Sequence, residues 1–483
     1  MTTFTVIAVF LPLFTGFSIY LVNKIDRIFC FFTVCFSAFY ASYILINDIN
    51  LPVQLLDNAG VQLLINNLSG YFILTNALVT GAVILYCWQI GKKTFFYTQL
   101  IVLHGSMNAL FLSADFLSVY VALEVVAISA FLLVVYPRTD NTLWVGIRYL
   151  FISNIAMLFY LIGTILVYKS NQSFAFEGLI NSPPEAIALI FLGLFTKGGV
   201  FVLGLWLPLT QSESESSVSA ILAGVVEKAG IFPLLRCTMM MDEFNTLIHI
   251  VGVATAFFGV IYALFSQDTK RILASSTVSQ FGWILVAPEV GGYYALAHGL
   301  AKANLFMAVG ALPSRSIRQL QDRVMSTRLW LTLLVGSLSI CGFPLFFGFA
   351  AKTLVLNSLS PTEELFMNIS AVGTAMIYAK FIFLPSHGVD RVKSHIWWGV
   401  IPLMTIIFVA NFLYFPAYTP LNVAKALGLN AIGFLLHFLI FKKVVFTLSR
   451  YFEELEQIMG IMILMLVVLF WMVISWSPVS FFA

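Results

Sequence analysis

Six ionisable residues of this sequence stand in the middle of long apolar runs, where charged groups are rare. They are Glu124 in SVYVALEVVAISAFLL, Lys197 in ALIFLGLFTKGGVFVLGLW, Lys228 in AILAGVVEKAGIFPLL, His298 and Lys302 in YYALAHGLAKANLFMAVGA, and Lys352 in CGFPLFFGFAAKTLVL. Each charge costs about 2.5–3.5 kcal/mol at the centre of a bilayer. Such residues therefore face a protein interior or a hydrated cavity, and not lipid.

The chemistry of these residues suits the relay of protons. Burial in a low dielectric favours the neutral form of a lysine, whereas a nearby carboxylate favours its charged form. A lysine held between these influences changes protonation when its neighbour moves, and histidine titrates near neutral pH without help. Glu124 and Lys197 are therefore predicted to form a switchable ion pair. The predicted path continues through the other four residues.

A single intramembrane lysine can also be a structural partner or can extend from a helix end to the lipid headgroups. Five separate positions make that explanation a poor one for the set as a whole. Lys380, in GTAMIYAKFIFLP, lies nearer a span end and is a weaker candidate, as is Arg148. Glu227 is expected to point to a different helix face from its neighbour Lys228. Lys92 is expected to be a loop charge.

The elements that position these residues must cross a membrane. Hydrophobic residues make up 60% of the 483 and charged residues 10%, whereas soluble domains carry about 25% charged residues. Helices cross a bilayer in apolar runs of about 17–25 residues, and about sixteen occur: 4–22, 28–46, 70–90, 97–112, 116–136, 146–168, 184–207, 216–238, 246–266, 271–287, 292–312, 328–356, 366–385, 396–418, 427–446 and 457–476. The first run lacks the basic start of a signal peptide. Residues 51–66 are expected to form a hairpin or an interfacial helix.

The fold class is thus an all-α polytopic membrane protein, with about fourteen core helices and about two further C-terminal helices. Basic residues gather in alternate loops, and the positive-inside rule places those loops in the cytoplasm and the amino terminus outside. The basic loops hold Lys24, Arg27, Lys92, Lys93, Arg138, Lys270, Arg271, Arg315, Arg318, Arg323, Arg391, Lys393, Lys442 and Lys443.

Two spans are predicted to be broken. Pro208 follows Lys197, and Gly342 and Pro344 precede Lys352. A proline inside a helix frees a backbone carbonyl, which persists in a membrane only where protein or water satisfies it. Paired broken helices mark transporters built from inverted repeats. The predicted divisions are N-terminal helices over 1–96, two five-helix repeats over 97–238 and 246–385, and C-terminal helices over 396–483.

Several chemistries have no signature in the sequence. There is no nucleotide-binding glycine loop, haem motif or iron–sulfur cysteine set, and the five cysteines lack metal spacing. We therefore expect no cofactor or resident metal, no catalytic residue and no nucleic-acid partner. If redox chemistry energises the protein, it takes place on another chain. A sodium site needs clustered oxygen ligands, and none can be identified from the sequence.

Four ordered motifs resemble the antiporter-like membrane subunits shared by respiratory complex I and the multisubunit Mrp-type cation/proton antiporters. They are WLPLTQSESESSVSAILAGVVEKAGIFPLLR, QDTKRILASSTVSQFGW, HGLAKANLFMAVGA and CGFPLFFGFAAK, within a resemblance over roughly residues 60–400. The resemblance implies a fifth-span carboxylate at Glu124 with its lysine partner at Lys197. It also implies a linking lysine at Lys228, a central pair at His298 and Lys302, and a terminal lysine at Lys352.

The chain departs from the family pattern at several positions. The aspartate after W-L-P is Leu209, the next histidine is Gln211, and the first histidine of the later pair is Tyr294. Glu215 and Ser217 replace the two prolines of A-P-T-P. These changes leave the lysines in place and bear on loop geometry, gating and one relay member.

The resemblance implies a proton-translocating subunit of a Na⁺/H⁺ antiporter, similar to the Mrp D subunit, in a bacterial plasma membrane or another energy-coupling membrane. Other membrane subunits, the lipid bilayer, protons and Na⁺ or another monovalent cation are the expected partners. The alternatives are a pump subunit of a complex I-like oxidoreductase and a proton-flux partner of a CO₂ or bicarbonate uptake enzyme. The C-terminal extension is expected to dock a neighbouring subunit or to serve as an anchor.

Overall fold

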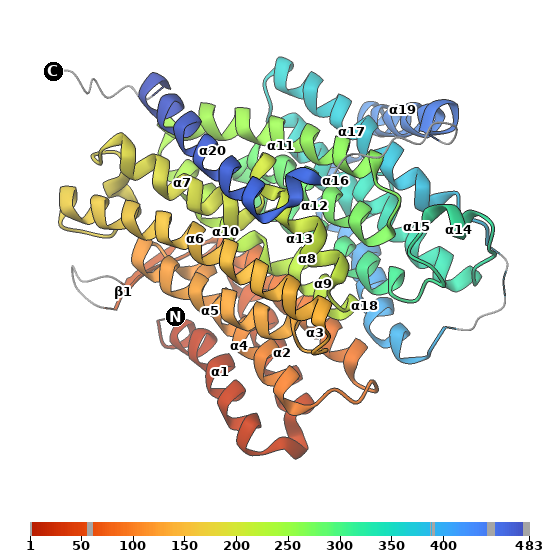
Figure 1. Cartoon of the computed structure of the whole chain (residues 1–483), viewed down its shortest axis with the longest axis horizontal. Helices are drawn as coiled ribbons and strands as arrows, with labels where there is room; N and C mark the ends of the chain where they lie inside the picture. Colours follow the sequence, from red (N-terminus) through yellow and green to blue (C-terminus); the bar gives the residue numbers. More distant parts are fainter. Residues whose placement is uncertain (1, 56–60, 387, 389–391, 442–449, 477–483) are drawn as a thin grey trace.

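The computed structural model describes residues 2–55, 61–386, 388, 392–441 and 450–476 of the 483-residue chain. Long helices pack side by side in one bundle, with α1 at one edge and α20 lying across the face shown in Figure 1. Within the described residues, 13 helical stretches are long and apolar enough to cross a membrane. The chain is therefore an integral, multi-pass membrane protein.

The long helices have the following bounds: α1 (Thr2–Leu21), α2 (Asp26–Ile46), α3 (Asn67–Cys87), α4 (Thr94–Leu112), α5 (Phe116–Val134), α6 (Asp140–Asn171), α7 (Pro184–Gly198), α8 (Leu207–Glu213), α9 (Ser216–Ile221), α10 (Lys228–Met240), α11 (Asn245–Phe265), α12 (Thr269–Leu285), α13 (Pro288–Val309), α14 (Ile317–Gln321), α15 (Thr327–Cys341), α16 (Phe347–Asn357), α17 (Pro361–Ile382), α18 (His395–Val409), α19 (Pro420–Leu436) and α20 (Leu455–Trp476). Short 3-10 or π turns are η1 (Asn23–Ile25), η2 (Phe176–Leu179), η3 (Phe201–Trp206), η4 (Leu222–Val226), η5 (Asp242–Phe244), η6 (Ala410–Ala417), η7 (His437–Phe441) and η8 (Tyr451–Glu453).

Thirteen of the sixteen spans predicted from hydropathy are confirmed by described helical stretches that are long and apolar enough to cross a membrane. Helices α12 and α13 and the pair α15–α16 fall outside the length and hydropathy limits met by the other stretches. With them, the described chain crosses the bundle sixteen times. Residues flanking the spans start several of them: the side chains of Asp115 and Ser326 accept hydrogen bonds from the first turns of α5 and α15, as N-caps do.

Residues 51–66 form the hairpin that was one of the two predicted alternatives for this segment. Strands β1 (Leu51–Gln54) and β2 (Gln62–Ile65) pair antiparallel, with Leu51 opposite Ile65. Isolated backbone bridges link the hairpin to its neighbours in space, from Leu63 to Ser113 and from Asp115 to Ala175. The hairpin therefore lies with the loops at one end of the bundle.

The loops lie at two faces, and each isolated backbone bridge among the described residues joins segments of the same face. The basic face consists of residues 22–25, 88–93, 135–139, 214–215, 266–268, 310–326, the described part of 383–394, and 450–454. The opposite face holds the hairpin and residues 113–115, 172–183, 241–244, 286–287, 358–360 and 418–419. Bridges Asp268–Ser316 and Ser326–Gly388 join loops of the basic face. This pairing agrees with sixteen crossings.

Both predicted breaks are present, although one lies elsewhere than predicted. Helix α7 ends at Gly198, and Gly199 has a left-handed φ of 63° before the chain continues as η3 and α8. Pro208 is not at the break, because it lies in the first turn of α8, where proline is tolerated. A Cβ at Gly199 would lie 2.1 Å from Leu207 Cδ1, so glycine is required there.

The second break lies where the sequence predicted it. Helix α15 ends at Cys341, Gly342 has a φ of 73°, and α16 begins at Phe347. Pro344 lies in the interruption, and Leu345 also takes a positive φ, of 84°. The two repeats and the four chain divisions remain predictions.

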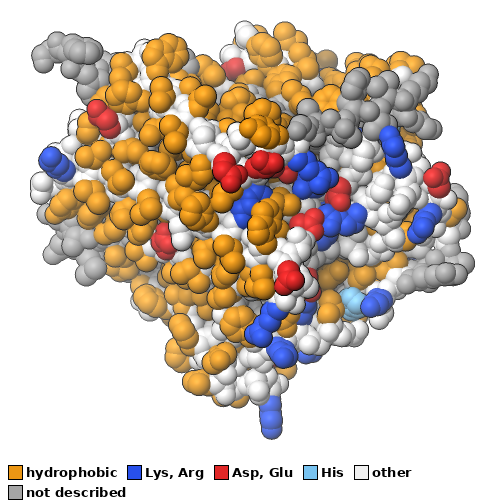
Figure 2. All heavy atoms as spheres, in the orientation of Figure 1, with side chains coloured by type: hydrophobic (Ala, Val, Ile, Leu, Met, Phe, Trp, Pro, Cys, Tyr) orange, Lys and Arg blue, Asp and Glu red, His pale blue; other side chains and the backbone are white. Residues whose placement is uncertain are grey.

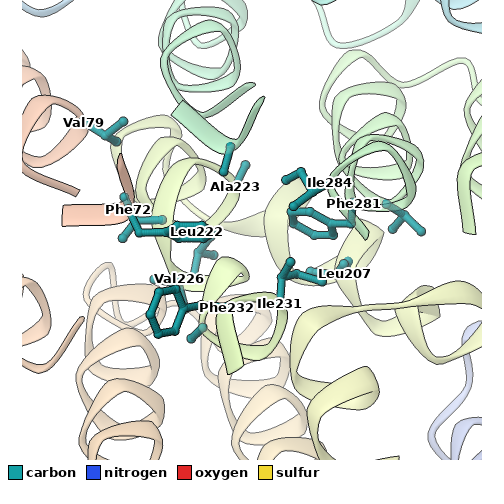
Figure 3. Close-up of a cluster of buried hydrophobic side chains, with 14 of the residues drawn as sticks. Phe72, Val79, Leu207, Leu222, Ala223, Val226, Ile231, Phe232, Phe281 and Ile284 are labelled. Carbon is teal, nitrogen blue, oxygen red and sulfur yellow. The ribbon is translucent and has the colours of Figure 1, made fainter. Parts of the chain in front are cut away.

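The centre of the bundle is the span that runs from α9 through the π turn η4 into α10. Every residue of its most apolar window is buried. Figure 3 shows part of the surrounding core: Leu222, Ala223, Val226, Ile231 and Phe232 of this span pack with Phe72, Val79, Leu207, Phe281 and Ile284 from other elements. A span that is apolar on all sides and buried can carry ionisable groups away from lipid.

The two last helices pack on different parts of the bundle. Helix α19 packs on α17, whereas α20 packs on α7 and η3, beside the first break. In the described residues, the C-terminal extension thus contacts its own chain. Docking to a neighbouring subunit remains a prediction.

Candidate functional site: a buried row of lysines

Lys197 occupies the last turn of α7, immediately before the first break. Its side chain is buried, and Nζ donates a hydrogen bond to Ser153 Oγ of α6 at 2.6 Å. The amine also lies 5.4 Å from the ring centroid of Tyr149, one turn earlier on α6. Helix α6 therefore supplies both a polar acceptor and an aromatic face to this lysine.

Glu124 lies on α5 and is partly exposed, unlike the lysine predicted to pair with it. No ion pair within 4.0 Å joins Glu124 to Lys197 in the part of the chain that the structure describes. Their charges still interact at longer range. The predicted pair is thus near but open in this conformation.

Lys228 follows the π turn η4, and the turn provides its acceptors. Nζ donates to the backbone oxygens of Ala223 at 3.2 Å and Gly224 at 2.5 Å. A π turn leaves carbonyls without their usual helical partners, so a lysine can satisfy them within the membrane. Gly299 of α13 passes so close that a Cβ there would lie 3.4 Å from Lys228 Nζ.

Lys302 and His298 lie one turn apart on α13 and are fully enclosed. Lys302 Nζ donates to the Leu273 backbone oxygen at 2.7 Å and to Ser276 Oγ, both on α12. Both ring nitrogens of His298 are buried with no hydrogen-bond partner among the described residues. A histidine in this state is free to take part in a water-mediated or proton-transfer contact.

Lys352 lies on α16, just after the second break. Its ammonium group stands 4.6 Å from the Trp283 ring centroid, and Nζ is buried with no hydrogen-bond acceptor among the residues that the structure describes. A narrow pocket of about 30 Å³, bordered by Gly342, Asn422 and Lys425, reaches this lysine from the side of the opposite face. That volume holds about one water molecule.

A ladder of hydrogen bonds between α12 and α17 spans the distance from Lys302 to Lys352. Its rungs are Ser276 with Tyr378 at 3.0 Å, Gln280 Nε2 to Thr374 Oγ1 at 3.4 Å, and Trp283 Nε1 to Ser370 Oγ at 3.3 Å. Ser276 accepts from Lys302, and Trp283 lies beneath Lys352. The ladder therefore joins the contacts of the two lysines.

Tyr294, which stands where the family pattern has a histidine, joins this ladder. Its hydroxyl donates to Gln280 Oε1 at 2.5 Å, and its ring stacks on Trp283 with 6.0 Å between centroids. The departure from the family pattern thus replaces an imidazole by a phenol in the same polar line.

Glu227 is a buried carboxylate that the sequence analysis did not include in the proton path. Its side chain is buried and accepts a hydrogen bond from Gln211 Nε2, while Oε2 has no partner within the described part of the chain. Its charge interacts with those of Lys228 and Lys302. Glu227 thus faces the same polar interior as the lysines. The rule that identified Glu124, a carboxylate in mid-span, would have identified it too.

The two weaker candidates have other roles. Lys380 Nζ donates to the backbone oxygens of Leu264 at 2.6 Å and Ser266 at 2.9 Å. It therefore satisfies carbonyls at the end of α11, as basic residues near helix C-termini do. Arg148 is buried near the Trp144 ring, and its charge interacts with Glu453 and Arg271. Among the described residues, no hydrogen bond or ion pair joins either residue to the row of lysines.

Comparison with known proteins identifies related chains. Residues 113–378, more than half of the chain, match the family described as "NADH:quinone oxidoreductase/Mrp antiporter, TM". A Staphylococcus aureus (strain JH9) protein named as the antiporter subunit mnhA2 is 30% identical over 399 residues, which cover 72% of this chain and 48% of the relative. The mnhA2 protein of Staphylococcus saprophyticus is 28% identical over 401 residues, covering 73% and 50%. The chain spans about half the length of these curated relatives.

Two solved structures share the fold. A chain of the membrane-bound sulfane sulfur reductase, an archaeal respiratory membrane complex, aligns with a TM-score of 0.76 at 20% identity, covering 88% of this chain and 97% of that one. A chain of the Mrp complex from Dietzia sp. DQ12-45-1b aligns with a TM-score of 0.74 at 18% identity, covering 95% and 100%.

Proposed function

Because this chain belongs to the NADH:quinone oxidoreductase/Mrp antiporter membrane family, we propose that it is a proton-translocating subunit of a multisubunit monovalent cation/proton antiporter. Protons are exchanged for Na⁺ or a similar cation. The named relatives are antiporter subunits, which supports the proposal. The similarity to the D subunit, predicted from the motifs, is part of the same proposal.

The observation that carries the proposal is the continuity of the buried polar row. Tyr149 lies beside Lys197, and its hydroxyl interacts electrostatically with Glu227. Glu227 in turn interacts with Lys228 and Lys302. From Lys302 the α12–α17 ladder continues to Lys352. A structural role would require each costly group to be satisfied locally, whereas His298 and Lys352 are not.

The two ends of the row differ in a way that suits directional transfer. Lys197 holds its proton against Ser153, and the approach of Glu124 would favour its charged form. Lys352 has a desolvated amine beside a pocket that leads to the opposite face, so the neutral form is favoured there. When the Glu124–Lys197 pair closes, Lys197 retains its proton at one end of the row. A proton that passes from Lys302 to Lys352 is then released at the other end.

The membrane potential is large enough to drive this exchange. Moving one elementary charge across a membrane is worth about 2.3 kcal/mol per 100 mV. Proton flow along the row can therefore support the export of a cation against its gradient. The cation passes through the assembly that this chain forms with its partner subunits, which we propose to be other membrane proteins of one hetero-oligomer.

The proposed setting is a bacterial plasma membrane, with the basic face in the cytoplasm and the amino terminus outside. The excess of Lys and Arg in the loops of the basic face supports this orientation.

The test of the proposal is cation-driven proton movement in sealed vesicles containing the full chain with its native partners. Lys197→Ala and Glu124→Ala should abolish the exchange while the complex still assembles. Lys93→Ala should not alter it, because Lys93 is exposed on the basic face. Unchanged exchange in Lys197→Ala would remove the mechanism.

A second candidate is a pump subunit of a redox-driven complex. The structural match to a chain of an archaeal respiratory membrane complex favours it. Purification in mild detergent, followed by mass spectrometry of the bound proteins, separates the two. Small hydrophobic subunits and a second antiporter-like chain support the antiporter, whereas flavin or iron–sulfur subunits support the pump. A single soluble enzyme would point to the third alternative, coupled CO₂ or bicarbonate uptake.

A further inference from the structure

A polar pocket of about 150 Å³ opens at the basic face, where α8, α11 and α12 meet the C-terminal segment. Its wall includes Gln267, Asp268, Arg271, Ser275, Arg450 and Glu453. The pocket has room for about five water molecules, since each occupies roughly 30 Å³ in the liquid. None of the six predicted proton-path residues lines it.

The floor of this pocket adjoins the contacts of Lys302. Ser275 lines the pocket and is 3% exposed. The next residue, Ser276, accepts a hydrogen bond from Lys302 Nζ, and Leu273 accepts another at 2.7 Å. One turn of α12 therefore contributes Ser275 to the pocket wall and, on neighbouring residues, the acceptors that bind the central lysine.

An ion pair lies in the wall of the pocket. Arg271 Nη1 donates to both carboxylate oxygens of Glu453, at 3.1 and 2.9 Å, and the side chains are only 10% and 11% exposed. The acid nearest in sequence, Asp268, is engaged elsewhere: it accepts from Arg315 Nε at 2.8 Å and caps the Arg271 backbone amide. Arg148 of α6 also interacts with the charge of Glu453.

The carboxylate comes from the far end of the chain. Glu453 ends η8, directly before α20, and η8 packs on η3 while α20 packs on α7. Figure 2 shows acidic and basic side chains gathered in the middle of this view, in the area where α20 begins in Figure 1. The C-terminal helix thus fixes one carboxylate against two arginines of the core.

Building on the function proposed above, we propose that this pocket is the water-filled access by which protons reach Lys302 from the basic face, with Glu453 offsetting the charge of Arg271 at its mouth. A proton entering the pocket passes Arg271. An unpaired guanidinium there would repel it, because charges at a narrow, partly desolvated mouth act strongly on local ion concentration. The C-terminal segment is, on this account, part of the conduction path.

The charge of the mouth can be measured without transport. The full chain, in its native complex and with Cys35→Ser to remove the exposed cysteine, carries Gln267→Cys. Sealed vesicles are treated with methanethiosulfonate reagents of similar size and opposite charge. Glu453→Gln should lower the cationic-to-anionic labelling ratio on the order of tenfold. Arg271→Gln should raise it, and the double variant should restore it.

The matched control is Glu364→Gln, which breaks the Lys425–Glu364 ion pair on the opposite face and should leave the ratio unchanged. If neither Glu453→Gln nor Arg271→Gln changes the cationic-to-anionic labelling ratio, the proposed effect of these residues on the charge of the pocket mouth is wrong. Silver ion, which is close in size to the common monovalent cations, should block proton flux in Ser275→Cys. Absence of any block would overturn the water access.

Proton flux separates this inference from the function on which it rests. Glu453→Gln should slow the flux severalfold, and Arg271→Gln in the same chain should recover it, which a misfolded protein could not do. If Lys302→Ala abolishes flux but Glu453→Gln leaves it unchanged, the pocket is not the access. If Lys302→Ala itself has no effect, the proposed function fails. A faster flux in Glu453→Gln would mean that the ion pair is a plug, which contradicts the proposal.

Discussion

The two broken helices share a left-handed glycine at the break, but the lysines beside the two breaks have different contacts. Each break has a glycine with positive φ, 63° at Gly199 and 73° at Gly342, and each lies beside a buried lysine. Lys197, before the first break, has a hydroxyl acceptor at 2.6 Å. Lys352, after the second, has no hydrogen-bond acceptor within the described part of the chain and lies 4.6 Å from the Trp283 ring centroid.

The surroundings of the two breaks also differ. The first is covered by α20, which packs on α7 and η3. The second borders a pocket toward the opposite face. A lysine ammonium over an aromatic ring is stabilised less than one that has a charged or hydroxyl partner in a site without water. The comparison is consistent with the proposal that Lys197 holds a proton and Lys352 releases one.

The largest effect is expected from replacing either lysine by arginine, which remains protonated at all accessible pH values. If both amines must lose a proton in each cycle, Lys197→Arg and Lys352→Arg each lower proton flux by more than roughly tenfold, a barrier increase of about 1.4 kcal/mol. Flux is measured with a pH-sensitive dye in sealed vesicles. Substantial flux in Lys197→Arg alone would break the comparison, since that lysine would then act only as a fixed charge.

A smaller effect is expected from alanine at the two left-handed glycines. Each substitution costs about 1–2 kcal/mol because alanine disfavours the left-handed backbone conformation. The thermal inactivation temperatures of the two variants should therefore fall by similar amounts. The new Cβ at Gly342 would lie 2.7 Å from Lys352 Cδ, whereas that at Gly199 meets Leu207. Gly342→Ala should therefore slow transport more than Gly199→Ala. Equal losses of transport would show that the position of Lys352 is unimportant.

Tyr294→Phe should have a moderate effect, because it removes the hydroxyl that donates to Gln280 in the ladder. A lost hydrogen bond of about 1 kcal/mol corresponds to a decrease in flux of about fivefold. The matched control is Tyr293→Phe, since the Tyr293 hydroxyl has no hydrogen-bond partner among the described residues. Equal flux in the two variants would place the proton route outside the ladder.

The smallest effect is expected at Lys93, where Lys93→Ala should change flux by less than about twofold, as exposed surface substitutions do. Lys92, which was predicted to be a loop charge, lies in the loop over residues 88–93 and also has local partners. It forms an ion pair with Glu215 at 2.6 Å and lies 4.7 Å from the Tyr136 ring centroid. A large loss in Lys93→Ala would show that the path passes through the basic loops.

Much of the fold could be predicted because the bilayer leaves a strong signal. Apolar runs located all the described spans, and glycine with proline located the second break. The first break was misplaced to Pro208, since the interruption depends on the backbone conformation of Gly199, and a proline in the first turn of a helix interrupts nothing.

The site was predicted less completely. Ionisable residues in mid-span are visible in a sequence, but their partners depend on how separate helices pack. The π turn that satisfies Lys228 and the α12–α17 ladder have no periodic signal. Glu227 was left out of the predicted path because it was expected to point away from Lys228, yet the span is buried on all sides and both side chains lie in the protein interior.

The central claim is that the two regions belong to one proton path, and Lys302 lies between them. The most direct measurement is therefore proton flux in sealed vesicles containing the full chain and its partners, comparing Lys302→Ala with Lys93→Ala. The account predicts that Lys302→Ala abolishes flux in an assembled complex while Lys93→Ala retains it. Undiminished flux in Lys302→Ala would contradict a single continuous path.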